Sequence, residues 1–190
     1  MRTEFEAKFY PVKKEDNRKK LNDLGAIMIY PEYLQKRVVY SNPSDLEGSW
    51  ARVRQEYDKI TMSLKRVIGN SINDQKEIEL VINDFQNASD LLSTLGCKQK
   101  AYQETKREKW ALDGAEIVID TWPFLEPLIE IEAENEKNVI NTSKKLGFNF
   151  DNAIFGAIDV IYEKVYGITK EKINNQTSKI IFEMENPFLK

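Results

Sequence analysis

The chain has 190 residues, of which 41% are apolar and 31% charged, and its formal net charge of −3 gives it no overall attraction for nucleic acid. It has no histidine and one cysteine, Cys97, which excludes histidine-ligated zinc, Ser-His and Cys-His nucleophilic sites, and an internal disulfide. The charged start and the lack of a long apolar run predict a cytoplasmic protein without a signal peptide or a membrane partner, and residues 1–190 fit one domain.

Extended segments alternate with helices along the chain. The first three predicted helices end in Leu-Gly, and a glycine directly after a helix is the expected left-handed cap. The predicted elements, in chain order, are a strand at 4–10, a helix at 14–24, strands at 26–30, 35–40, 49–57, 60–67 and 76–83, a helix at 84–95, strands at 98–112, 115–122 and 128–133, and helices at 136–146 and 153–166. The tail from 174 is either one further docked strand or a loosely held end.

Several of these strands carry a charge at every second position, with apolar residues between the charges. They are Glu4-Phe5-Glu6-Ala7-Lys8, Arg52-Val53-Arg54, Glu77-Ile78-Glu79 and Glu130-Ile131-Glu132. Positions i and i+2 share one face of a strand, so each segment has a charged face and an apolar face. A solvated face with cross-strand salt bridges explains any single segment. Because the pattern recurs with both signs, we predict an α+β fold, a β-barrel with a charged interior and an apolar exterior that helices cover.

A charged interior of this kind suits a polyanion and metal ions. Confined carboxylates repel one another and are normally neutralised by a cation or by basic neighbours. Arginine forks bind phosphate oxygens in pairs, and lysine supplies a point charge. Because histidine is absent, any metal must be held by oxygen, which favours a hard ion such as Mg²⁺ or Mn²⁺.

The opening Glu4-x-Glu6-x-Lys8 resembles the ExExK signature of the CYTH superfamily, the triphosphate tunnel metalloenzymes. This superfamily includes class IV adenylate cyclases, thiamine triphosphatases and inorganic triphosphatases. Later motifs follow the same order: Ala51-Arg52-Val53-Arg54, Leu64-Lys65, Glu77-x-Glu79, Lys106-Arg107, Ile119-Asp120 and Glu130-Ile131-Glu132. The resemblance is strongest over about residues 1–166, which leaves 167–190 as a C-terminal extension. It implies an eight-stranded antiparallel tunnel that binds a triphosphate along its axis.

The resemblance also assigns roles to individual residues. The phosphate-binding residues are Lys8, Arg52, Arg54, Lys65 and Arg107, and the metal ligands are Glu4, Glu6, Asp120, Glu130 and Glu132, supported by Glu77 and Glu79. The signature residues Glu4, Glu6 and Lys8 are the catalytic candidates. Arg37 lies on a strand where family members commonly carry an acidic residue, and it is either an extra phosphate contact or a surface residue.

The implied activity is metal-dependent hydrolysis of the terminal phosphate of tripolyphosphate, ATP or thiamine triphosphate. The alternative enzyme is a class IV adenylate cyclase that converts ATP to cyclic AMP and pyrophosphate. A non-catalytic sensor of polyphosphate or nucleotide would keep the basic residues but would not need a full set of metal ligands. All of the proposed glutamate ligands are present, which favours catalysis. Both a monomer and a homodimer fit the sequence, and no nucleic acid polymer is expected as a partner.

Overall fold

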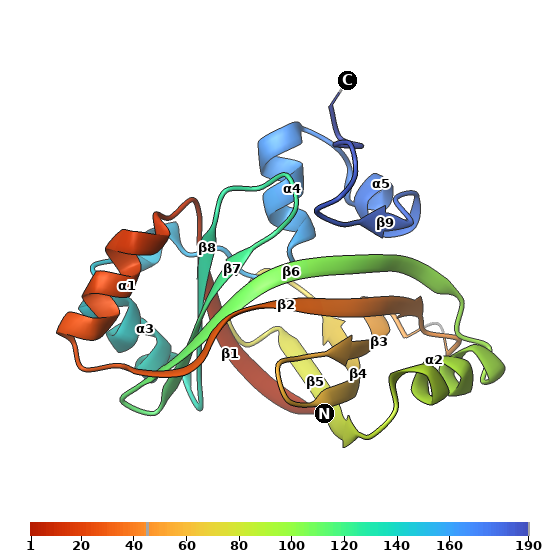
Figure 1. Ribbon diagram of the computed structural model, residues 1–190, viewed down its shortest axis with the longest axis horizontal. Coiled ribbons are helices and arrows are strands. Elements are labelled where there is room, and N and C mark those ends of the chain that lie inside the picture. Colours follow the sequence, from red (N-terminus) through yellow and green to blue (C-terminus); the bar gives the residue numbers. More distant parts are fainter. Residues whose placement is uncertain (45, 190) are drawn as a thin grey trace.

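The computed structural model describes residues 1–44 and 46–189 as a closed antiparallel β-barrel with an additional short strand. Neighbouring strands follow the order β2-β3-β4-β5-β1-β8-β7-β6, and pairing of β2 with β6 closes the barrel. Figure 1 shows β2 and β6 as two long arcs that run side by side. The barrel strands are β1 (Arg2–Phe9), β2 (Ile27–Ser41), β3 (Ser49–Gln55), β4 (Ile60–Val67), β5 (Gln75–Ile82), β6 (Gln99–Leu112), β7 (Ala115–Thr121) and β8 (Leu128–Ala133).

The helices cover the outer, apolar faces of the strands. They are α1 (Lys14–Asp23), α2 (Phe85–Thr94), α3 (Glu136–Lys145), α4 (Asp159–Tyr166) and α5 (Lys170–Asn175), with a short 3₁₀ helix at Phe150–Asn152. Leu21 of α1 and Val139 of α3 pack with Ala7 and Ile131 of the barrel in one core cluster. Leu92 of α2 packs in a second cluster over β2 and β3. In Figure 1, α1 and α3 lie together beside the barrel, and α4, α5 and β9 (Lys179–Ile180) gather above β6. The predicted fold class is therefore confirmed.

The ends of the first three helices follow local sequence rules. Gly25, Gly96 and Gly147 each follow the last helical turn with positive φ angles of 74°, 93° and 81°, which confirms the predicted left-handed caps. At the N-termini of α2 and α3, the side chains of Asp84 and Asn135 accept hydrogen bonds from backbone N–H groups at 2.7 and 2.9 Å. Among the described residues, no helix is both long and apolar enough to cross a membrane.

The prediction of two separate strands at 26–30 and 35–40 is wrong, because β2 runs unbroken from Ile27 to Ser41. Tyr30 faces Lys109 and Tyr33 faces Arg107, so three steps along β2 match two along β6. This bulge contains Pro31, which lacks a backbone N–H and is tolerated where the ladder is interrupted. Pro31 thus lies at a bulge within one strand and not at a break between two strands.

The prediction for the C-terminal region is partly wrong. The helix expected at 153–166 begins only at Asp159, because Ile154 forms two backbone hydrogen bonds with Lys8 and Gly156 has a φ of 94°. The helix α5 was not predicted. The tail is docked rather than loose, since β9 pairs in parallel with β6 and both Ile180 and Phe188 are buried.

Candidate functional site

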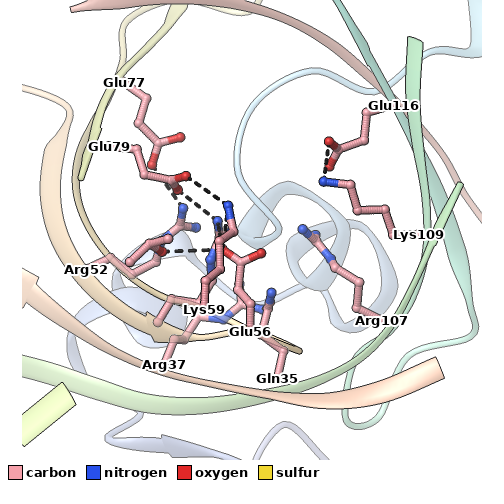
Figure 2. Close-up of polar contacts among 12 residues, drawn as sticks. Gln35, Arg37, Arg52, Glu56, Lys59, Glu77, Glu79, Arg107, Lys109 and Glu116 are labelled. Carbon is pink, nitrogen blue, oxygen red and sulfur yellow. Dashed lines mark hydrogen bonds and ion pairs between the residues drawn. The ribbon is translucent and has the colours of Figure 1, made fainter. Parts of the chain in front are cut away.

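A cavity of about 620 Å³ lies inside the barrel. Every charged residue to which the sequence analysis gave a role lines it: Glu4, Glu6, Lys8, Arg37, Arg52, Arg54, Lys65, Glu77, Glu79, Arg107, Asp120, Glu130 and Glu132. They meet there because the two-residue period of each strand places alternate side chains on the inner face of the barrel. Figure 2 shows several of them directed into the interior from facing walls. Their roles toward phosphate and metal stay predictions.

Lys8 lies between two glutamates of the interior. Its ammonium group contacts the carboxylate of Glu6 on the same strand and lies 3.3 Å from Oε2 of Glu130 on β8. Burial favours the neutral amine, but the attraction of Glu130 and Glu6 outweighs burial and raises the pKa of Lys8. In turn, although burial opposes it, Lys8 is the main cause of a lowered pKa at Glu130. Both groups are therefore charged at neutral pH.

Glu4 and Glu6 converge on a single amide group. Nε2 of Gln75 donates hydrogen bonds to Oε2 of Glu4 at 2.6 Å and to Oε2 of Glu6 at 2.7 Å. Nζ of Lys65 lies 3.0 Å from Glu4 and 3.5 Å from Glu77. Burial and the neighbouring carboxyl group of Glu77 raise the pKa of Glu4. The carboxyl groups in this part of the cavity therefore carry more negative charge than Lys8 and Lys65 neutralise.

Glu132 lies in a row of acids across three strands. It faces Glu6 of β1 on one side and Glu116 of β7 on the other. Burial, followed by repulsion from Glu6, raises the pKa of Glu132 to about 7. Within the described part of the chain, no lysine or arginine forms an ion pair with it.

Arginines from three strands line the facing wall. Arg52 donates a hydrogen bond to Glu77 at 3.0 Å, and Arg54 donates one to Glu79 at 2.9 Å. Arg107 donates two hydrogen bonds to Asp120, at 2.8 and 2.6 Å. The buried Nε atoms of Arg52 and Arg54 have no protein partner among the described residues. These guanidinium groups therefore keep donors for a further acceptor.

Arg37 is the exception among these arginines. Its guanidinium stacks on Trp122 with 4.4 Å from Cζ to the ring centroid and donates to Gln35 and Thr105. No carboxylate in the described residues forms an ion pair with it, and its buried Nε lacks a partner. Burial, then repulsion from Arg52, lowers the pKa of Arg37. With 5% of its surface exposed, it is not a surface residue.

Residues 2–150 match the CYTH domain family. The chain belongs to this family. No curated protein is similar enough in sequence to match the chain.

Solved structures share the CYTH fold with this chain. A conserved hypothetical protein from Pyrococcus furiosus is 24% identical with a TM-score of 0.67, and the alignment covers 80% of this chain and 94% of that one. A candidate adenylate cyclase from Vibrio parahaemolyticus is 10% identical with a TM-score of 0.72, covering 85% and 98% of the two chains. A candidate adenylyl cyclase from Hippeastrum, whose structure is described as revealing a dominant triphosphatase activity, is 14% identical with a TM-score of 0.56, covering 92% and 100%. At these identities the likeness establishes the fold.

The CYTH family implies a divalent metal ion, and the donor chemistry of the cavity fits one. The carboxylates supply the oxygen ligands that hard cations prefer, and the raised pKa of Glu132 indicates negative charge without a counterion. Over residues 1–44 and 46–189, no three acidic side chains form a ready-made metal cluster. The ammonium groups of Lys8 and Lys65 contact these acids instead. A metal ion must therefore take over contacts that the two lysines make here.

Sequence reasoning missed several residues of the cavity wall. Glu56, Lys109 and Glu116 continue the two-residue spacing from Arg54, Arg107 and Asp120, so the strand period carried the signal for them. Gln75, two positions before Glu77, has the same signal, whereas the others had none, since they lie in a turn, at the start of a strand or in the C-terminal region: Lys59, Lys100, Asp159 and Asn174.

Proposed function

We propose that this CYTH-family protein is a divalent-metal-dependent enzyme that hydrolyses the terminal phosphate of a triphosphate. The observation that carries the proposal is one cavity inside the barrel in which arginines with unused donors face a wall that has more carboxylates than lysines. The arginines suit phosphate oxygens, and the carboxylates suit a cation. A substrate that carries both, a triphosphate with Mg²⁺ or Mn²⁺, satisfies the two walls together.

Each wall has a proposed task. The basic residues bind the phosphate oxygens, which positions the triphosphate for attack, and they stabilise the negative charge that develops on those oxygens in the transition state. These residues are Lys8, Arg37, Arg52, Arg54, Lys65 and Arg107. The metal would be held by Glu4, Glu6, Glu130 and Glu132, with Asp120 as a further ligand. Glu77 and Glu79 orient Arg52 and Arg54 through their ion pairs. A divalent ion, when bound, supplies charge neutralisation at the phosphates.

Hydrolysis is preferred over cyclisation on chemical grounds. A cyclase must hold the ribose 3′-hydroxyl in line with the α-phosphorus, whereas a hydrolase needs only to admit water. The barrel has the same fold as candidate adenylate cyclases, so the cyclase reaction is the second candidate. The two reactions release different products, and one assay separates them.

The test is a product assay with Mg²⁺ or Mn²⁺ and with ATP, thiamine triphosphate and tripolyphosphate offered separately. We expect phosphate release that stops when the metal is chelated. Cyclic AMP with pyrophosphate would instead identify a cyclase. If no substrate turns over but a triphosphate still raises the melting temperature, the protein is a sensor.

Two variants test the roles proposed for the acidic and the basic side chains of the cavity. Glu6→Gln keeps the size of the side chain but removes a proposed metal ligand, and we expect turnover to fall at least about 100-fold. Arg54→Ala should weaken triphosphate binding more than it lowers the melting temperature. Glu163→Gln, on the exposed face of α4, is the control for both. Metal-dependent turnover that survives Glu6→Gln would show that the proposed metal site is wrong.

A further inference from the structure

A second, smaller cavity of about 380 Å³ adjoins one end of the tunnel. The two cavities share five wall residues: Trp50, Lys100, Ala157, Asp159 and Asn174. We call this smaller cavity the vestibule. Its volume is in the range of small-molecule pockets. Asp159 and Asn174 lie outside residues 2–150, the part of the chain that matches the CYTH family.

Asp159 begins α4 and is buried, with 7% of its surface exposed. Nδ2 of Asn174, on α5, donates a hydrogen bond to Oδ2 of Asp159 at 2.7 Å. No described lysine or arginine forms an ion pair with this carboxylate. A buried carboxylate with one amide donor still has acceptor capacity for a ligand.

Lys100 lines the same opening from the start of β6. Burial lowers the pKa of its amine, against the attraction of Glu171 and Asp159. The vestibule therefore presents the buried carboxylate of Asp159, the amides of Asn70 and Asn174 and the ammonium groups of Lys100 and Lys170, with Trp50 as an aromatic wall. Asn70 and Lys170 are exposed. The opposite mouth differs, because its charges pair with one another: Lys109 contacts Glu116 at 2.5 Å and Lys59 lies 3.6 Å from Glu79.

These groups select the chemistry of an occupant. A phosphate beside Asp159 would be repelled by the carboxylate, whereas N–H or O–H donors would be bound by it. Lys100 is suited to the phosphate that lies next to the vestibule. We propose that the vestibule binds the organic group of an organic triphosphate, an aromatic ring or sugar with hydrogen-bond donors, and that Asp159 and Asn174 determine specificity for it. This inference rests on the proposed function and narrows its substrate class.

The experiment compares organic and inorganic substrates in the full-length protein with Mg²⁺ or Mn²⁺. kcat and KM are measured for ATP, thiamine triphosphate and tripolyphosphate in wild type, Asp159→Asn and Asn174→Ala, with Glu163→Gln as a control on the same helix. Asp159→Asn keeps a side chain that can bond to Asn174, so α4 and α5 stay joined. Because the lost acceptor serves only the organic group, the ratio of kcat/KM for the preferred organic substrate to kcat/KM for tripolyphosphate should fall about tenfold or more, mainly through KM.

Other outcomes overturn the inference. A ratio that stays constant in both variants, whether or not activity falls, would make Asp159 and Asn174 purely structural. A wild-type protein that hydrolyses tripolyphosphate but neither organic substrate would refute the inference and leave the proposed function intact. A wild-type protein that neither hydrolyses nor binds any of the triphosphates would refute both.

Discussion

At the scale of single residues, Arg37 is a buried cation without a counterion among the residues that the structure describes. It has no carboxylate partner in the described chain, and its neighbours across β3 include Arg54. A buried cation without a counterion lowers the stability of the folded state by several kcal/mol unless a bound anion neutralises it. The sequence left Arg37 open between a phosphate contact and a surface residue. Deciding between the two requires knowing whether the face of β2 that carries Arg37 points into the barrel or toward solvent. In the closed barrel, that face points inward.

We predict that Arg37→Met stabilises the ligand-free protein by about 1 kcal/mol and weakens tripolyphosphate binding at least about tenfold. Urea unfolding and calorimetric titration measure the two effects. Arg107→Met is the matched control, because it leaves the buried carboxylate of Asp120 without its ion-pair partner. It should lower the free energy of unfolding by about 3 kcal/mol. If Arg37→Met destabilises the protein as much as Arg107→Met does, Arg37 is a structural residue.

At the scale of elements, strands with alternating charge were predictable because the period of a strand is local. The alternation of Glu4, Glu6 and Lys8 with Phe5 and Ala7 is enough to define both faces of β1. The C-terminal elements were harder, since nothing local shows that Ile154 bonds to the backbone of Lys8 and holds the chain extended before α4. Short elements such as α5 and β9 form only because they pack against the rest of the protein, so their local sequence does not predict them.

The docked tail gives a prediction at this scale. Ile180 of β9 is fully buried in the cluster that contains Trp122, Ile161 and Phe188. Ile180→Ala should therefore lower the free energy of unfolding by about 3 kcal/mol. Leu189→Ala, at an exposed position of the same tail, should change it by less than about 0.5 kcal/mol. Equal effects in thermal or urea unfolding would mean that the tail does not contribute to the core.

At the scale of the whole molecule, barrel closure decides which charges meet. β2 pairs with β6 over residues about 70 positions apart in sequence, such as Arg37 with Gln103. The sequence indicates which side chains face inward but not which strands become neighbours. The acidic row of Glu6, Glu132 and Glu116 exists only after β1, β8 and β7 align. Most of the charged residues that line the cavity were thus predictable, whereas their pairing was not.

That row makes the stability of the barrel depend on pH. The pKa of Glu132 is raised to about 7 in the folded chain from an ordinary value of 4.5, so the folded state binds the proton more tightly than the unfolded state. Stability contributed by the protonated group is present below the unfolded pKa and is lost as the pH rises through about 7. Without metal or triphosphate, wild type should lose about 2 kcal/mol more than Glu132→Gln between pH 5 and pH 8.

The measurement is urea unfolding at both pH values in the presence of a chelator. Glu134→Gln is the control, because Glu134 is an exposed neighbour on the same segment and should follow wild type. If Glu132→Gln also follows wild type, the carboxyl group of Glu132 titrates normally and the row carries no excess charge. Adding Mg²⁺ or Mn²⁺ at pH 8 should restore stability to wild type but not to Glu132→Gln, because a cation bound at the row takes the place of the proton.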